Sequence, residues 1–133
     1  MAATRQLPRL DADNRAFWTS GADGKLRIAQ CQDCRTFIHP PKPVCRKCLS
    51  EKVRPVAVPG TGVVDTFTVN HQKWRPDMEV PFVIARVAID DAPGVFLTTN
   101  IVGCPVDSVD IGDRVRVKFE QNADVWIPLF EKA

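Results

Sequence analysis

Cys31-Gln-Asp-Cys34 and, ten residues later, Cys45-Arg-Lys-Cys48 form the stretch from which the fold of this chain can be read. Each Cys-x-x-Cys pair places two thiolates within reach of one metal ion, and a structural zinc site takes such ligands at about 2.3 Å. The spacing predicts a zinc ribbon with Cys31, Cys34, Cys45 and Cys48 as ligands. A catalytic zinc keeps one position open for water or substrate, so four thiolates predict a structural site.

The segment between the two pairs, residues 35–44, contains three prolines and is too short for a helix. It favours two metal-binding knuckles over a helix-bearing finger. Iron can occupy the same sulfur cage, so the metal is zinc or iron at this point. His39 lies between the pairs and could replace a thiolate, but with four sulfurs available we expect it to be a loop residue.

Two disulfides, or redox-active Cys-x-x-Cys pairs, are the alternatives to a metal. Disulfides belong mainly to secreted proteins, and Met1–Pro8 lacks the apolar core of a signal peptide. A thioredoxin-like motif needs a strand-to-helix setting, which the prolines around Cys45 oppose. We therefore expect a metal site.

Length and charge limit the remaining possibilities. The 133 residues suffice for one small domain beside a ribbon whose core is replaced by metal. The net charge is +2 with acids and bases mixed along the chain, which predicts neither nucleic acid nor an anionic membrane as a partner. The longest apolar run, Val80–Ile89, is broken by Pro81 and Arg86 and is too short to span a bilayer. We expect a soluble, cytoplasmic protein.

A short helix is predicted over Leu10–Gly21. Asp11 or Asp13 can cap its first turn, and Gly21 can adopt the left-handed conformation that ends a helix. Phe17 and Trp18 are too apolar for such a helix to stand alone. We expect Phe17 to pack within the chain, whereas Trp18 suits an internal contact and a contact with another protein almost equally.

The ribbon is expected to begin with a strand and end with a linker. Gly24–Gln30 alternates Leu26 and Ile28 with polar residues, which predicts the strand that enters the first knuckle. Ser50–Pro55 is charged and is expected to be a short linker.

Beyond the ribbon, five short β-type runs alternate with turn residues. In the clearest run, Arg114–Glu120, Val115, Val117 and Phe119 share one face and charged residues share the other. Five strands in about 75 residues match a small closed barrel, for which the OB-fold is the leading candidate. The predicted strands are Val63–Asn70, Phe82–Ile89, Val95–Ile101, Arg114–Glu120 and Trp126–Phe130.

The sequence thus predicts a mainly β, small α+β protein in three parts. These are an N-terminal helical segment (1–23), a zinc ribbon (24–55) and a five-stranded OB-fold barrel (56–133).

Three further stretches carry a resemblance to a known family: Gly60-Thr-Gly-Val-Val-Asp-Thr-Phe-Thr-Val69, Pro81-Phe-Val-Ile-Ala-Arg-Val87 and Asp110-Ile-Gly-Asp-Arg-Val-Arg-Val117. With the helical segment and a rubredoxin-like ribbon before them, they resemble the acyl-CoA-associated OB-fold proteins over nearly the whole chain. Members of that family accompany thiolase-like enzymes, including archaeal acetoacetyl-CoA thiolase with hydroxymethylglutaryl-CoA synthase, and bacterial aldolases that shorten steroid side chains as CoA thioesters. The resemblance implies an accessory subunit in a heterotetramer, sharing an acyl-CoA with a partner that performs the reaction.

The residues themselves point away from independent catalysis. His39 and His71 are the only histidines, and no nucleophile elbow, phosphate-binding loop or zinc-protease helix is present. Cys104 has no activating neighbour in sequence and is expected to be a packing residue. Asp90 and Asp91 precede Ala-Pro-Gly and suit a hairpin turn. His71 could act as an acid or base in a partner's site, although a hydrogen-bonded histidine at the barrel rim is the simpler expectation.

The loop between the first two barrel strands, Asn70–Pro81, holds an aromatic residue flanked by cations: Lys73, Trp74 and Arg75. OB-folds commonly bind ligands at this loop. The three side chains can stack on adenine and pair with phosphate, which predicts a contact with CoA or with a partner. The alternative is a solvated loop in which Trp74 covers the barrel mouth.

Three functions remain open at this stage. The leading one is a non-catalytic accessory subunit of a thiolase-like enzyme acting on acyl-CoA thioesters. A nucleic-acid-binding ribbon and OB module is second, although the basic strand Arg114–Lys118 shows no aromatic among its outward residues. A stand-alone acyl-CoA enzyme is third.

Overall fold

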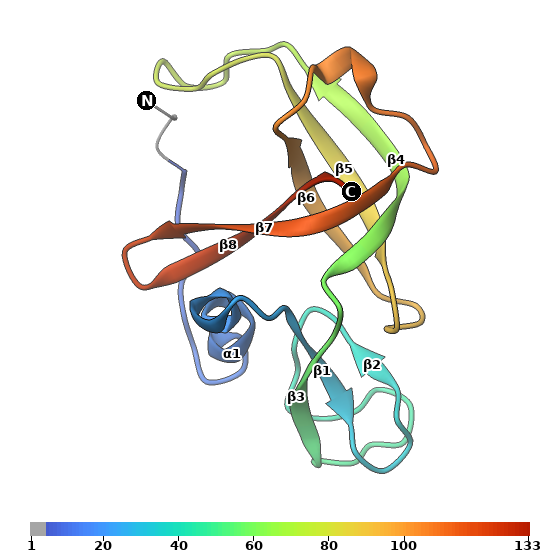
Figure 1. Ribbon diagram of the computed structural model, residues 1–133. Helices are drawn as coiled ribbons and strands as arrows, with labels where there is room; N and C mark the ends of the chain where they lie inside the picture. Colours follow the sequence, from blue (N-terminus) through green and yellow to red (C-terminus); the bar gives the residue numbers. More distant parts are fainter. Residues whose placement is uncertain (1–4) are drawn as a thin grey trace.

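The computed structural model describes residues 5–133 and shows a ribbon lobe below a β-barrel, with a short helical segment beside the barrel (Figure 1). The helical segment consists of α1 (Arg15–Trp18) and the 3-10 turn η1 (Ser20–Asp23). The ribbon sheet contains β1 (Arg27–Cys31), β2 (Phe37–Ile38) and β3 (Val53–Ala57). The barrel contains β4 (Thr61–Asn70), β5 (Phe82–Ile89), β6 (Phe96–Val102), the 3-10 turn η2 (Val106–Ser108), β7 (Arg114–Asn122) and β8 (Val125–Lys132).

The five barrel strands close in the order β4-β5-β6-β8-β7, with β7 returning to β4. All neighbours are antiparallel except β6 and β8, which pair in parallel. This is the five-stranded barrel that the sequence predicts, so the mainly β fold class is confirmed. The alternation in β7 is also confirmed, because Val115 is fully buried and Arg114 and Arg116 are exposed.

The first barrel strand, β4, pairs with a different strand on each side, β7 and β5. It pairs with β7 through its first three residues and with β5 along most of its length, with a bulge between Val64 and Thr66. Bulges bend a strand and increase its twist, which closure of a small barrel requires. A Cβ at Gly62 would lie 2.4 Å from the Ala88 carbonyl oxygen, so only glycine allows this close strand approach.

The N-terminal helix is shorter than predicted, and the expected left-handed end at Gly21 is wrong. A carboxylate oxygen of Asp11 accepts hydrogen bonds from the backbone N–H groups of Asp13 and Asn14, at 2.9 Å each. Asp11 thus caps the turn that leads into α1, as predicted, although α1 itself begins only at Arg15. The residue at the cap position is Asn14, whose side chain makes no capping bond. The left-handed residue is Gly24 (φ 78°), not Gly21.

Gly21 has a packing role in place of the expected stop. A Cβ there would meet Phe119 Cδ1 at 2.5 Å and Trp126 Cβ at 2.6 Å, so glycine lets η1 lie directly on the β7–β8 hairpin. Phe17 is buried and Trp18 packs on it edge-to-face, with ring centroids 4.9 Å apart. Both aromatic residues therefore have contacts within the chain.

The expected linker after the ribbon is partly a strand. β3 starts at Val53 and pairs with β1 over five residues, so Val53–Pro55 belong to the ribbon sheet. The ribbon has a small core of its own formed by Ala29, Cys31, Ile38 and Cys45. Leu26 and Ile28, by contrast, are fully buried in the barrel cluster together with Phe17. The main core is therefore continuous from the helical segment through the start of the ribbon into the barrel.

Candidate metal centre and ligand-binding cavity

Two backbone turns with the same hydrogen-bond pattern present the four cysteines. In the first, Arg35 N–H donates to the Cys31 carbonyl at 2.9 Å, and in the second Leu49 N–H donates to the Cys45 carbonyl at 2.9 Å. Arg35 (φ 66°) and Leu49 (φ 64°) are left-handed. This conformation turns the chain back after each second cysteine, so that both sulfurs of a pair face the same point.

The four Sγ atoms lie within 4.8 Å of one another. Cys31 and Cys48 approach to 3.5 Å, and Cys34 and Cys45 to 3.6 Å. A tetrahedral zinc with sulfurs at about 2.3 Å needs edges of about 3.8 Å between them. The structure therefore brings together the four sulfurs that the sequence predicts, at distances that fit a structural zinc. Sulfur fills all four coordination positions, so none is open to substrate.

The thiols differ in acidity in a way that suits a divalent cation. The Thr36 hydroxyl, followed by the Thr36 backbone N–H, lowers the pKa of Cys34 to about 6. The pKa of Cys48 rises to about 12, because the effect of the Ser50 N–H that lowers it is outweighed by hydrogen bonds with the neighbouring sulfurs and by desolvation. One thiolate forms readily and the last is opposed by nearby sulfur, so complete ionisation calls for a cation in the centre.

His39 lies outside this sulfur cluster. Its ring is 4.9 Å from that of Phe17, and burial lowers the pKa of His39. Its Nδ1 is buried and has no hydrogen-bond partner within residues 5–133. His39 thus links the ribbon to the helical segment by packing, as a loop residue after β2.

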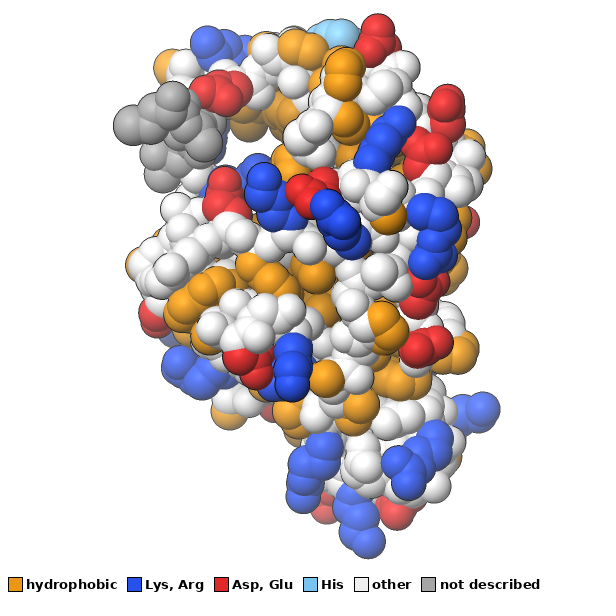
Figure 2. Space-filling view, viewed as in Figure 1, with side chains coloured by type: hydrophobic (Ala, Val, Ile, Leu, Met, Phe, Trp, Pro, Cys, Tyr) orange, Lys and Arg blue, Asp and Glu red, His pale blue; other side chains and the backbone are white. Residues whose placement is uncertain are grey.

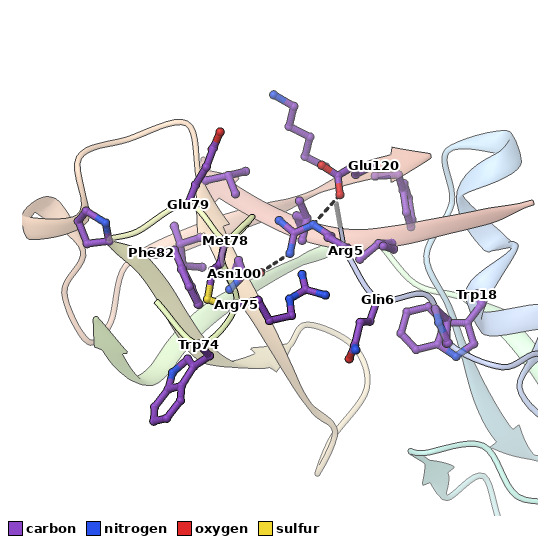
Figure 3. Close-up of a pocket in the computed structure, with 18 residues that line it drawn as sticks. Arg5, Gln6, Trp18, Trp74, Arg75, Met78, Glu79, Phe82, Asn100 and Glu120 are labelled. Atoms are coloured by element: carbon purple, nitrogen blue, oxygen red, sulfur yellow. Dashed lines mark hydrogen bonds and ion pairs between the residues drawn. The ribbon is translucent and has the colours of Figure 1, made fainter. Parts of the chain in front are cut away.

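A cavity of about 870 Å³ lies on the barrel face. Figure 3 shows its residues, with Trp74 at one end, Trp18 at the other and Arg5 and Arg75 between them. Met78, Phe82, Ile101, Phe119, Ile127 and Leu129 form much of its apolar lining. Its size and composition are those of small-molecule sites, in which apolar walls surround a few polar groups.

Arg5, Gln6 and Pro8 line one side of this cavity, and the side chain of Arg5 holds them there. Its Nε lies 2.6 Å from Glu120 Oε2, and one of its Nη atoms donates to Asn100 Oδ1 at 2.8 Å (Figure 3). Asn100 is itself oriented by donating to the Val83 carbonyl at 2.8 Å. The sequence gives no sign of this cluster, because Arg5 is at least 95 residues from Asn100 and Glu120 and no motif joins them.

The structure places two of the three predicted ligand contacts, Trp74 and Arg75, in the cavity lining and the third, Lys73, outside it. Trp74 is 71% exposed, lines the cavity, and donates from its indole N–H to Asn70 Oδ1 at 3.1 Å. Arg75 also lines the cavity and lies 3.5 Å from Asp77. Lys73 is exposed and does not belong to the lining. Two of the three residues, Trp74 and Arg75, therefore line the cavity.

The remaining candidates have structural surroundings. His71 is exposed just after β4 and does not line the cavity. Cys104 is half-buried against the main core, as expected of a packing residue. Asp90 and Asp91 do form the β5–β6 turn, and Asp91 is left-handed (φ 61°). Within residues 5–133, no helix is long and apolar enough to cross a membrane.

Comparisons with known proteins cover both parts of the chain. Residues 18–54 match the model of the ChsH2 rubredoxin-like zinc ribbon domain, and residues 55–120 match that of the ChsH2 C-terminal OB-fold domain. A chain of the solved Ltp2-ChsH2(DUF35) aldolase is 34% identical, with a TM-score of 0.82 over 95% of this chain and 98% of that one.

Two curated relatives are hydratase subunits. A probable enoyl-CoA hydratase alpha subunit of Thermomonospora curvata is 36% identical over 98% of this chain and 41% of its own length. A 3-oxo-4,17-pregnadiene-20-carboxyl-CoA hydratase alpha subunit of Mycobacterium tuberculosis is 32% identical over 84% of this chain and 35% of its own length. The chain thus spans about two fifths of these relatives. On the match to both domain models and to the aldolase chain, the protein belongs to the ChsH2 (DUF35) family, with a rubredoxin-like zinc ribbon followed by an OB-fold.

Proposed function

We propose that this chain is a non-catalytic accessory subunit of a thiolase-like aldolase that acts on acyl-CoA thioesters, including steroid side-chain CoA esters. The observation that carries the proposal is the 34% identical match over 98% of a chain of the Ltp2-ChsH2(DUF35) aldolase. The chain's own residues agree with a supporting role. The four sulfurs fill every ligand position of a tetrahedral metal, and His71 does not line the cavity.

Zinc supplies structure in this proposal. Cys31, Cys34, Cys45 and Cys48 hold it, and its binding energy replaces the apolar core that the ribbon lacks. The barrel supplies a wall of the CoA channel, and the partner supplies the catalytic acid, base and oxyanion donors.

The cavity edge at Trp74 and Arg75 is the proposed CoA contact. An exposed indole held by Asn70 offers a flat surface for adenine, and Arg75 with the nearby Lys73 offers cations for the phosphates. The apolar lining beyond them suits the less polar part of the thioester.

Co-expression with the Ltp2-type aldolase subunit of the same organism tests the assembly. We expect the two chains to elute together as a two-plus-two heterotetramer, measured by size-exclusion chromatography with light scattering, and only the complex to cleave a CoA thioester. Turnover by the purified chain alone, abolished in His71→Ala, would establish a stand-alone enzyme instead. Separate elution would contradict the proposal.

The CoA contact is tested separately within the complex. Trp74→Ala should weaken CoA binding, measured calorimetrically, by about tenfold or more, because stacking of a base on an aromatic ring contributes about 1–3 kcal/mol. Ile111→Ala removes another exposed apolar side chain, 68% exposed, and should leave CoA affinity unchanged. Equal affinities of Trp74→Ala and the wild type would place CoA elsewhere.

A further inference from the structure

The ribbon carries a net positive charge, whereas the rest of the chain carries a net negative one. Residues 24–57 contain eight Lys or Arg and two Asp or Glu, a net charge of +6, whereas the rest of the chain has a net charge of −4. Zinc with four thiolates carries −2, so a loaded ribbon keeps +4. Figure 2 shows Lys and Arg side chains gathered over the lower lobe. The overall charge of +2 conceals this separation.

Three of these cations lie on the two metal-binding turns and have no carboxylate partner. Among the ion pairs found within residues 5–133, none includes Arg35, Arg46 or Lys47. All three side chains are exposed. Unpaired exposed cations close together repel one another, and a surface of opposite charge relieves that repulsion.

Two aliphatic side chains lie beside these cations, at either end of the second turn. Val44 is 39% exposed and Leu49 is 75% exposed. Leu49 is also left-handed, a conformation that costs a residue with a Cβ about 1–2 kcal/mol and that glycine or asparagine adopts more easily. The metal-binding turn accounts for the left-handed backbone, since Arg35 adopts it at the equivalent position of the first turn. It does not account for a leucine there, whose large apolar side chain is left exposed to solvent.

We infer that this knuckle face (Arg35, Val44, Arg46, Lys47 and Leu49) docks on the partner enzyme, at an apolar pocket for Leu49 bordered by Asp and Glu side chains. An apolar centre within a polar, solvent-accessible rim is the usual anatomy of a protein interface. The inference rests on the proposed function, because it takes the thiolase-like aldolase subunit as the partner. β1 runs away from the barrel toward this face, which leaves the barrel cavity free for ligand (Figure 1).

A protein fits this face better than a nucleic acid does. Single strands are bound through aromatic side chains interleaved with cations. Phe37 is the one Phe, Tyr or Trp in residues 24–57, and it is half-buried. The outward cations of β7 do not extend the basic surface, since Arg114 and Arg116 are paired with Asp90 and Glu131.

Leu49→Asn is the decisive variant, because asparagine suits the left-handed backbone. It should fold with an unchanged or higher Tm and still weaken binding to the aldolase subunit at least tenfold, measured by calorimetry. Arg46→Glu/Lys47→Glu should weaken binding at least tenfold and reduce its dependence on salt. Ile111→Asn, at an exposed isoleucine on the barrel, should bind as the wild type does.

Three other outcomes would contradict the inference, and the measurements distinguish them from one another. If the wild type binds the aldolase and both knuckle-face variants bind equally well, the interface lies elsewhere and the proposed function stands. If the wild type does not bind the aldolase, the proposed function and the inference fail together. Binding of a single-stranded oligonucleotide that the charge-reversal variant loses would reassign the face to nucleic acid.

Discussion

Asp90 shows how one side chain joins parts of the barrel that are distant in sequence. It follows β5, accepts a hydrogen bond from the Thr61 hydroxyl at 2.6 Å, and is ion-paired with Arg114. Thr61 begins β4 and Arg114 begins β7, so the carboxylate connects the strands where the barrel closes. The Arg114 hydrogen bond, followed by that of Thr61, holds the pKa of Asp90 below its ordinary value.

Because the pKa of Asp90 is lowered in the folded protein, the free energy of unfolding should depend on pH in a defined direction. The contribution of Asp90 is present above its unfolded-state pKa of about 3.9 and is lost as pH falls through the lower folded-state value. Asp90→Asn should therefore reduce the free energy of unfolding at pH 7 by up to about 1 kcal/mol, as expected for a partly exposed pair. Between pH 5 and pH 3 the variant should lose less stability than the wild type.

Urea denaturation at several pH values checks this, with Asp91→Asn as the matched control. Asp91 is the exposed neighbour in the same turn, and asparagine tolerates its left-handed backbone. The control should follow the wild-type pH profile. Parallel profiles for Asp90→Asn and the wild type would show that the ion pair contributes nothing to stability.

At the scale of elements, the ribbon and the barrel are stabilised by different means. The ribbon has three strands of five residues or fewer and a small core that includes two of its four cysteines. So few buried side chains cannot stabilise a separate unit, and metal binding takes their place. The barrel closes its own edges and buries an extensive aliphatic core.

Removal of one ligand should unfold the ribbon first. Cys31→Ser should lower bound zinc from one equivalent toward none, measured by metal analysis, and cost several kcal/mol. Hydrogen exchange should show protection lost first in β1–β3, with a smaller loss in β4–β8, whose core includes Leu26 and Ile28. Cys104→Ser, which changes the one cysteine outside the cluster, should keep its zinc. Absence of zinc and iron from freshly purified wild-type protein would refute the metal assignment.

At the scale of the whole molecule, the three predicted segments share one core. Phe17 from the helical segment and Leu26 and Ile28 from the start of the ribbon pack with the barrel interior. The domain boundaries at residues 23 and 55 remain a prediction. Because side chains from all three segments pack in one core, we expect the segments to unfold together rather than independently.

Leu26→Ala measures this coupling. Leu26 is fully buried, so the substitution should cost about 2–5 kcal/mol of unfolding free energy. If the core is shared, the loss appears in the barrel transition as well, followed by hydrogen exchange of β4–β8. Ala22→Ser, at an exposed position nearby, serves as the control. Unchanged protection of the barrel in Leu26→Ala would show that the ribbon and barrel unfold independently.

Sequence alone determined the features whose signals are local. The Cys-x-x-Cys spacing identified the sulfur cluster, and two-residue alternation identified the strand at Arg114–Glu120, because side chains alternate faces along any strand. A short β-type run between turn residues identified Phe82–Ile89. The tertiary structure alone decided the rest. The helix ends, the Gly21 contact with Phe119 and the Arg5 bonds to Glu120 and Asn100 depend on neighbours far away in the chain. Such contacts arise only when the chain has folded, and no local pattern encodes them.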